Sequence, residues 1–186
     1  MKNPVAMNRI LCIVFVAVLT ACSTLKVTYD YDGQADFTKY KTFAFTEEAL
    51  KLPVQQLNRD RLLQAIENEL VAKGITKSED NPDALIDLHV KAEEKIEATA
   101  TSTGPGYGYY GRYGYGGGFS TTRIDYNKYV VGTLFVDLVD KTSQKIVWQG
   151  RATKTLDENV SAEKRESNIK YAAKQLFSKY PPAKKK

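Results

Sequence analysis

The chain has 186 residues and a mass of 20.8 kDa, which is long enough for one domain with a real core and short for two. Its apolar fraction of 42% and charged fraction of 26% are typical of a protein that folds in water. The formal charge of +5 falls to 5 − 2 = +3 without the leader described below, and the lysines at 184–186 carry three of the remaining positive charges. The body is therefore nearly neutral, and we expect no nucleic-acid partner.

Residues 1–21 have the pattern of an export signal peptide. Lys2 and Arg9 are followed by an almost wholly apolar run over 10–19. A membrane-spanning helix needs about 20 apolar residues, and this run is well short of that. We predict a signal peptide that is cleaved. Whether translation starts at Met1 or at Met7 stays open.

Residues 19–23, Leu-Thr-Ala-Cys-Ser, resemble the lipobox of bacterial lipoproteins. This resemblance predicts cleavage between Ala21 and Cys22, lipidation of Cys22, and a lipidated tether over 22–26. Several acyl chains would hold the protein on the membrane almost permanently. Ser23 stands where an aspartate would resemble an inner-membrane retention signal, which favours the periplasmic side of the outer membrane. The alternative is an ordinary secretory cleavage site beside a chance cysteine.

The rest of the chain offers little for catalysis. Cleavage removes Cys12, so Cys22 is the only cysteine left and no disulfide can form within the mature chain. The only histidine is His89, which argues against a histidine-rich metal site or a Ser-His-Asp mechanism. The acidic pairs Glu93–Glu94 and Asp137–Asp140 invite a glycosidase interpretation, but any acidic surface offers such pairs. We expect no catalytic residues, no metal and no cofactor.

In chain order, residues 25–33 alternate polar and apolar side chains and predict a strand, and a second short strand is expected over 42–45. A helix is predicted from Leu57 to Lys73, with Asn58 as its cap and Gly74 just past its end. Residues 84–92 alternate again and predict a strand whose outer face carries Asp87 and His89, the latter as an ordinary solvated residue.

The C-terminal third contains the clearest pattern. Residues 129–140 and 146–155 alternate on both sides of a polar turn and predict an antiparallel hairpin, with Trp148 in the core. A second amphipathic helix is expected over 161–180, followed by a basic, disordered tail over 181–186. Together these elements predict an α+β domain over 27–180: an antiparallel sheet of about five strands with two amphipathic helices packed on one face.

A Gly/Tyr-rich segment over 98–123 contains most of the 12 glycines and predicts a long mobile loop. Residues 106–111 match the G-x-G-x-x-G fingerprint, but a Thr/Ser run precedes them and more glycines follow, so we reject a dinucleotide site. The segment is a candidate binding loop through stacking tyrosines and one charge, or else a tolerated insertion without a role. The binding residues would be Tyr107, Tyr109, Tyr110, Arg112, Tyr113 and Tyr115.

The order and spacing of several motifs resemble a known family. The motifs lie at 27–32, 36–45, 70–74, 81–83, 132–134 and 147–150, after the lipobox. Together they are similar to the bacterial lipoprotein family catalogued as domain of unknown function 4136. The resemblance implies a lipid-anchored envelope protein with an α+β domain and no established activity or cofactor.

The expected function is therefore that of a non-enzymatic binding or structural module of the cell envelope. Its expected partners are the membrane, through the N-terminal lipid, and an envelope protein or cell-wall glycan. The alternatives are a hydrolase of envelope polymer, or an accessory subunit of an envelope transport or assembly complex.

Overall fold

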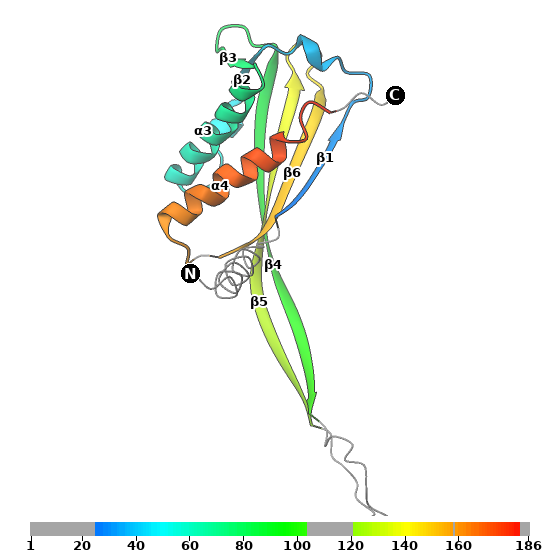
Figure 1. Ribbon diagram of the computed structural model, residues 1–186, viewed down its shortest axis with the longest axis vertical. Coiled ribbons are helices and arrows are strands. Elements are labelled where there is room, and N and C mark those ends of the chain that lie inside the picture. The colour runs from blue at the N-terminus through cyan, green and yellow to red at the C-terminus, as the bar shows by residue number, and fades with distance from the viewer. Residues whose placement is uncertain (1–24, 104–120, 158, 183–186) are drawn as a thin grey trace, which may run out of the picture.

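The computed structural model describes residues 25–103, 121–157 and 159–182 (Figure 1). Along the chain the elements are β1 (Lys26–Tyr31), a 3-10 helix η2 (Phe37–Lys39), β2 (Thr42–Phe45), α2 (Glu47–Leu50), α3 (Gln56–Ala72), β3 (Thr76–Lys77), β4 (Ala84–Thr103), β5 (Thr121–Asp140), β6 (Ile146–Leu156) and α4 (Ala162–Phe177). The α+β class is confirmed.

The six strands form one sheet in the order β1-β6-β5-β4-β2-β3. The expectation of about five strands, all antiparallel, is wrong, because β2 runs parallel to both β3 and β4. Helices α2 and α3 lie between β2 and β4 in the chain, and such a crossover lets two strands pair in parallel. β3 has two residues, which is too short for alternation to reveal it.

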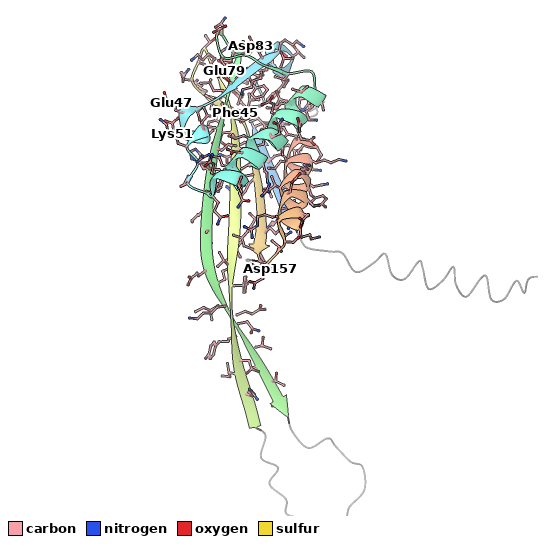
Figure 2. All side chains as sticks on the ribbon, turned by 90° about the vertical axis from the view of Figure 1, so that its left-hand side faces the viewer. Phe45, Glu47, Lys51, Glu79, Asp83 and Asp157 are labelled. Atoms are coloured by element: carbon pink, nitrogen blue, oxygen red, sulfur yellow. The ribbon has the colours of Figure 1, made fainter. Side chains whose placement is uncertain are left out.

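Helices α3 and α4 lie side by side on one face of the sheet, as expected (Figure 2). The core lies between them and the strands. Trp148 is fully buried there, as predicted, and its ring stacks on Phe177 of α4 with centroids 5.6 Å apart. A Cβ atom at Gly150 would lie 2.4 Å from Trp148 Cη2 and 2.9 Å from Leu176 Cδ2. Only glycine fits where the sheet comes this close to α4.

The start of α4 and the end of α3 agree with prediction, whereas α4 ends at Phe177 and not at Tyr180. α4 begins after Ser161, whose Oγ accepts a hydrogen bond from the backbone N–H of Lys164. Gly74, with φ +81°, follows the end of α3. The cap predicted at Asn58 is wrong: α3 begins at Gln56, so that Asn58 lies in its first turn and donates its backbone N–H to Gln55 O.

Strands β4 and β5 are longer than predicted. They pair without a break from Ala84 opposite Asp140 to Thr103 opposite Thr121. The loop predicted over 98–123 is therefore wrong at both ends, where 98–103 and 121–123 are strand. These stretches are rich in threonine, whose β-branched side chain favours extended backbone.

The carboxylates of Asp140 and Asp83 stabilise the end of the sheet at which β5 ends, by accepting hydrogen bonds from neighbouring segments. Asp140 Oδ1 accepts from the backbone N–H of Ser143 at 2.7 Å, and its Oδ2 accepts from Tyr40 Oη at 2.9 Å and pairs with Lys39. The Lys39 ammonium and these donors hold the pKa of Asp140 well below its usual range, while burial raises the pKa of Tyr40 to about 12. Asp83 accepts from the backbone N–H groups at 41 and 42 and so fastens the start of β2.

Candidate interaction surface

Beyond the body, β4 and β5 continue as a projecting two-stranded hairpin (Figure 1). The pairing of β6 with β5 ends at Leu156 opposite Val130, and Asp157 marks the level at which the hairpin leaves the body (Figure 2). We call residues 95–103 and 121–129 the arm. Its nine residue pairs extend for about 30 Å at about 3.4 Å per residue.

One face of the arm is apolar. Side chains alternate along a strand, so Ile96 lies on the same face of β4 as Ile86 and Leu88, which are buried at 0% and 1% exposure under the helices. Ile96 itself is 63% exposed, and opposite strand β5 contributes Ile124 and Tyr126, exposed at 52% and 67%. The face of β4 that is buried in the core therefore continues along the arm, where it is exposed to solvent.

The other face of the arm is charged. It carries Lys95 and Glu97 on β4 and Arg123 and Asp125 on β5, all exposed. The side chains of Arg123 and Asp125 pair along the strand at 3.0 Å. Lys128, which lies opposite Ile96, is the one charged residue on the apolar face of the described arm. The arm is amphipathic, because its other charged side chains lie on the opposite face.

Asp87 marks the point at which the outer edge of β4 becomes free. The last contact of β2 with this edge is the hydrogen bond from Thr46 N to Ile86 O. Asp87 Oδ1 then accepts from Leu88 N at 2.9 Å and from Thr46 Oγ1 at 2.7 Å. Since Ile86 directs its carbonyl outward, even-numbered residues of β4 direct their backbone groups to this edge. Within the described residues, no strand pairs with the edge beyond this point.

A polar cluster lies on the sheet face opposite the helices, within the body and eight residues along β4 from the arm. Asp87 on β4 lies directly opposite Asp137 on β5, which in turn lies opposite Gln149. Asp87 Oδ2 contacts His89 Nε2 at 2.9 Å, and Asp137 Oδ1 accepts from Gln149 Nε2 at 2.8 Å. Asp137 is 4% exposed. Burial raises the pKa of its carboxyl group, and the negative charge of the nearby Asp87 raises that pKa further.

The acidic pairs named from the sequence do not form carboxylate dyads. Asp137 and Asp140 accept hydrogen bonds from different groups, Gln149 for the first and the Lys39–Tyr40–Ser143 set for the second. Glu93 pairs with Lys91 at 2.6 Å, and its neighbour Glu94 follows on the opposite face of the strand. His89 is exposed on the outer face, as predicted.

A shallow depression of about 400 Å³ lies beside this free edge of β4. It is lined by Glu47, Glu48, Lys51, Leu52, Pro53, Leu88, His89 and Val90. The pKa of Glu47 is lowered by the Lys51 ammonium, 2.8 Å away. Asp137, whose pKa is raised, is not among the lining residues.

The N-terminal end of β1 lies at the base of the arm. The registers place Lys26 opposite Thr153, Thr153 opposite Thr133, and Thr133 opposite Lys91 in one row across the sheet. Of the residues 22–26 predicted as a tether, Leu25 packs against the core and Lys26 begins β1, so these two belong to the folded domain. The chain therefore enters the domain at the end of the sheet from which the arm projects.

The family model described as a domain of unknown function, DUF4136, matches residues 27–182. This chain belongs to the DUF4136 family. The match covers almost all of the domain and confirms the resemblance drawn from the motifs. The family description assigns no activity, and no curated protein matches the chain.

The comparison with solved structures finds matches to this DUF4136 protein at low sequence identity. A PDZ domain protein from Parabacteroides distasonis has a TM-score of 0.52 and 17% identity over 94% of this chain, which spans only 40% of that protein. A PelC dodecamer from Paraburkholderia phytofirmans has a TM-score of 0.46 and 15% identity, over 83% and 95% of the two chains. A minor lipoprotein from Acinetobacter baumannii has a TM-score of 0.33 and 17% identity, over 75% and 91%.

The binding and processing residues named from the sequence lie outside the described part of this DUF4136 protein. They are Ala21, Cys22, Tyr107, Tyr109, Tyr110, Arg112, Tyr113 and Tyr115, together with the tail at 183–186. None of the helices in the described ranges is long and apolar enough to cross a membrane. The arm is the feature that sequence reasoning missed. Its signal was the run of isoleucine, alanine and threonine on both sides of the glycines.

Proposed function

We propose that this protein is anchored by lipid at Cys22 on the periplasmic side of the outer membrane and is a non-enzymatic interaction module. The arm binds another component of the cell envelope. The observation that carries the proposal is the apolar face of β4, which is buried at Ile86 and Leu88 and exposed at Ile96. Contiguous exposed apolar surface of this kind marks interaction sites on folded proteins.

The edges of the arm support the same conclusion. A two-stranded hairpin alone in water is marginally stable, and open strand edges accept further strands readily. Addition of a strand to such an edge is a common mode of protein recognition, in which the backbone supplies affinity and side chains supply specificity. The arm offers both a free edge and an apolar face, so a protein partner fits it better than a glycan.

The lipobox supports the anchor, and the base of the arm supports its position. The described domain begins at Leu25, three residues after Cys22, and those residues span about 10 Å when extended. The base of the arm lies at that same end of the sheet. A lipid on Cys22 would therefore hold the arm near the membrane surface, where other envelope proteins are concentrated.

The hydrolase alternative is less well supported. A general acid needs a carboxyl group with a raised pKa within reach of bound substrate. Here Asp137 has the raised pKa but is buried on the sheet, whereas the depression beside β4 has Glu47, whose pKa is lowered. Incubation of the purified protein with peptidoglycan should release no fragments, and release that Asp137→Asn abolishes would favour the enzyme.

Site-specific photo-cross-linking in intact cells tests the role of the arm. A photoreactive residue replaces Ile124 on the arm or, as a matched control, Ile146 at the start of β6, since both are strand isoleucines 52% exposed. We expect a defined adduct from position 124 and none from position 146. Equal labelling at both positions, or no adduct at 124, would contradict the proposal.

Mass measurement of the mature protein tests the anchor. Lipidation of Cys22 adds the mass of several acyl chains to the N-terminal peptide, and Cys22→Ala should remove that mass completely. A wild-type N-terminal peptide that begins at residue 22 without acyl mass would show an ordinary secretory cleavage site instead.

A further inference from the structure

We propose that the partner of the arm's free edge is the same edge in a second copy of this chain. β4 of the two copies pairs antiparallel about a two-fold axis at Ile96, which creates a four-stranded arm in the order β5-β4-β4-β5. This inference rests on the proposed function of the arm as an interaction surface and names its occupant.

The backbone geometry fits a two-fold axis at this position. The even-numbered residues of β4 direct their N–H and C=O groups to the free edge, as the bond from Thr46 N to Ile86 O establishes. In an antiparallel ladder, two residues whose backbone groups point at each other exchange both hydrogen bonds. An axis at Ile96 places Ile96 opposite its own copy, Glu94 opposite Ala98, and Ala92 opposite Ala100. Each of these pairs joins two outward-directed residues.

The side chains select this register over its neighbours. With the axis at Ile96, Lys95 lies opposite Glu97 of the second copy, and the pair occurs twice by symmetry. An axis at Glu94 would pair Lys95 with Glu93 and Lys91 with Glu97, but it would also place the Glu94 carboxylate opposite its own copy. An axis at Ala98 would place Lys95 opposite Thr101 and leave its charge unmatched. Opposite charges across strands stabilise a sheet and like charges destabilise it. Of these three registers, only the axis at Ile96 pairs opposite charges without placing like charges opposite each other.

The exposed apolar face gains from the same pairing. A two-fold axis perpendicular to a sheet leaves each face on its own side, so the Ile96, Ile124 and Tyr126 side chains of both copies come together on one face. The arm then has four strands in place of two, and three or more strands with an apolar face are what a sheet needs for independent stability.

The surroundings of the edge allow a second strand to approach. Asp87 ends the pairing with β2 by accepting from Leu88 N, and the depression beside Val90 leaves the edge open past α2. A two-fold axis normal to the membrane would also bring the N-terminal ends of both copies to the same height, so that both proposed lipid anchors reach one leaflet.

A lipid surface fits the arm less well. The arm and the strand residues next to it carry Lys95, Arg123 and Lys128 against four acidic side chains, for a net charge of 3 − 4 = −1 over 92–103 and 121–131. That charge gives no attraction to anionic head groups. The open backbone groups of the edge would also be costly in hydrocarbon, where water cannot satisfy them.

Charge reversal in the full-length lipoprotein, purified in detergent micelles, tests the register. We expect Lys95→Glu and Glu97→Lys each to weaken the dimer about ten-fold, because each change creates two like-charge pairs. The double variant exchanges the charges and should return dimerisation to within about two-fold of wild type. Arg123→Glu, on the charged face of β5 and away from the edge, is the matched control and should leave the dimer unchanged. Dimer mass against concentration is the measurement.

A photoreactive residue at position 96 in intact cells separates this inference from the proposed function. An adduct of this chain with itself at position 96, with rescue by the double charge exchange, supports the second copy. Adducts at 96 and 124 that contain only a different protein overturn the second copy and leave the proposed function standing. Adducts with lipid alone, or none at either position, overturn both.

Discussion

The two halves of β4 have the same alternation and different surroundings. Between Ala84 and Leu88 the even-numbered side chains are buried in the core, and the outer edge pairs with β2 as far as Ile86. Between Ile96 and Ala100 the same phase is exposed and the same edge has no described neighbour. An amphipathic strand pattern therefore shows which face of the strand is apolar. It does not show which part of the chain, or which partner, buries that face.

The largest expected contrast compares Ile86→Ala with Ile96→Ala, which remove the same atoms from the same face of one strand. Ile86 is fully buried, so its truncation leaves a cavity and should lower the free energy of unfolding by about 3 kcal/mol. Ile96 is exposed, so its truncation should change the stability of the dilute monomer by less than about 0.5 kcal/mol. Denaturant unfolding of a chain that starts at residue 23 measures both, and equal losses would show that the arm is covered in the monomer.

The next largest effect is expected at Asp140, whose hydrogen bonds stabilise the end of the sheet opposite the arm. Asp140→Ala leaves the buried Tyr40 hydroxyl and the Ser143 N–H without an acceptor and should cost about 2 kcal/mol at neutral pH. The folded pKa of Asp140 is lowered, so its contribution is present above the unfolded pKa of 3.8 and disappears as the pH falls through the folded value. The stability gap between wild type and variant should therefore narrow at low pH. A gap that does not change with pH would rule out the carboxylate as its source.

A smaller effect of opposite sign is expected at Asp137, which is buried in the body three residues before Asp140 on β5. Its folded pKa is raised by burial, so wild type loses stability as the pH rises from 3.8 through the folded value. Asp137→Asn keeps an acceptor for Gln149 and removes the buried charge, so the variant should become more stable than wild type at neutral pH. Unfolding at pH 3 and pH 7 measures the change, and a variant that is less stable at pH 7 would contradict it.

The smallest effect on stability is expected from the arm itself. Removal of 96–128, with Lys95 and Tyr129 joined through an Asn-Gly turn, should leave the unfolding free energy of the body within about 0.5 kcal/mol of wild type. The reason is that the arm packs on nothing else in the described chain. The same variant should lose every adduct formed through the arm, and a clearly destabilised body would show that the arm has a structural role.

Local chemistry in the sequence was enough to predict much of this molecule. Ser161 predicts the start of α4, Gly74 predicts the end of α3, and the alternation around Trp148 predicts a core strand. The order of short motifs was enough to identify the DUF4136 family. These features depend on neighbours along the chain, so a single sequence carries them.

Contacts between distant residues decided the rest. The parallel pairing of β2 depends on a crossover through two helices, and the cap at Asn58 failed because the backbone enters α3 earlier than the side chains suggest. Asp137 acquires its raised pKa mainly because the folded sheet buries its carboxyl group, and the negative charge of Asp87 on the next strand adds to the shift. Above all, alternation at Ile86 and at Ile96 is the same along the chain. Only the tertiary structure shows that helices cover the first and leave the second exposed, because cover is supplied by residues far away in the sequence.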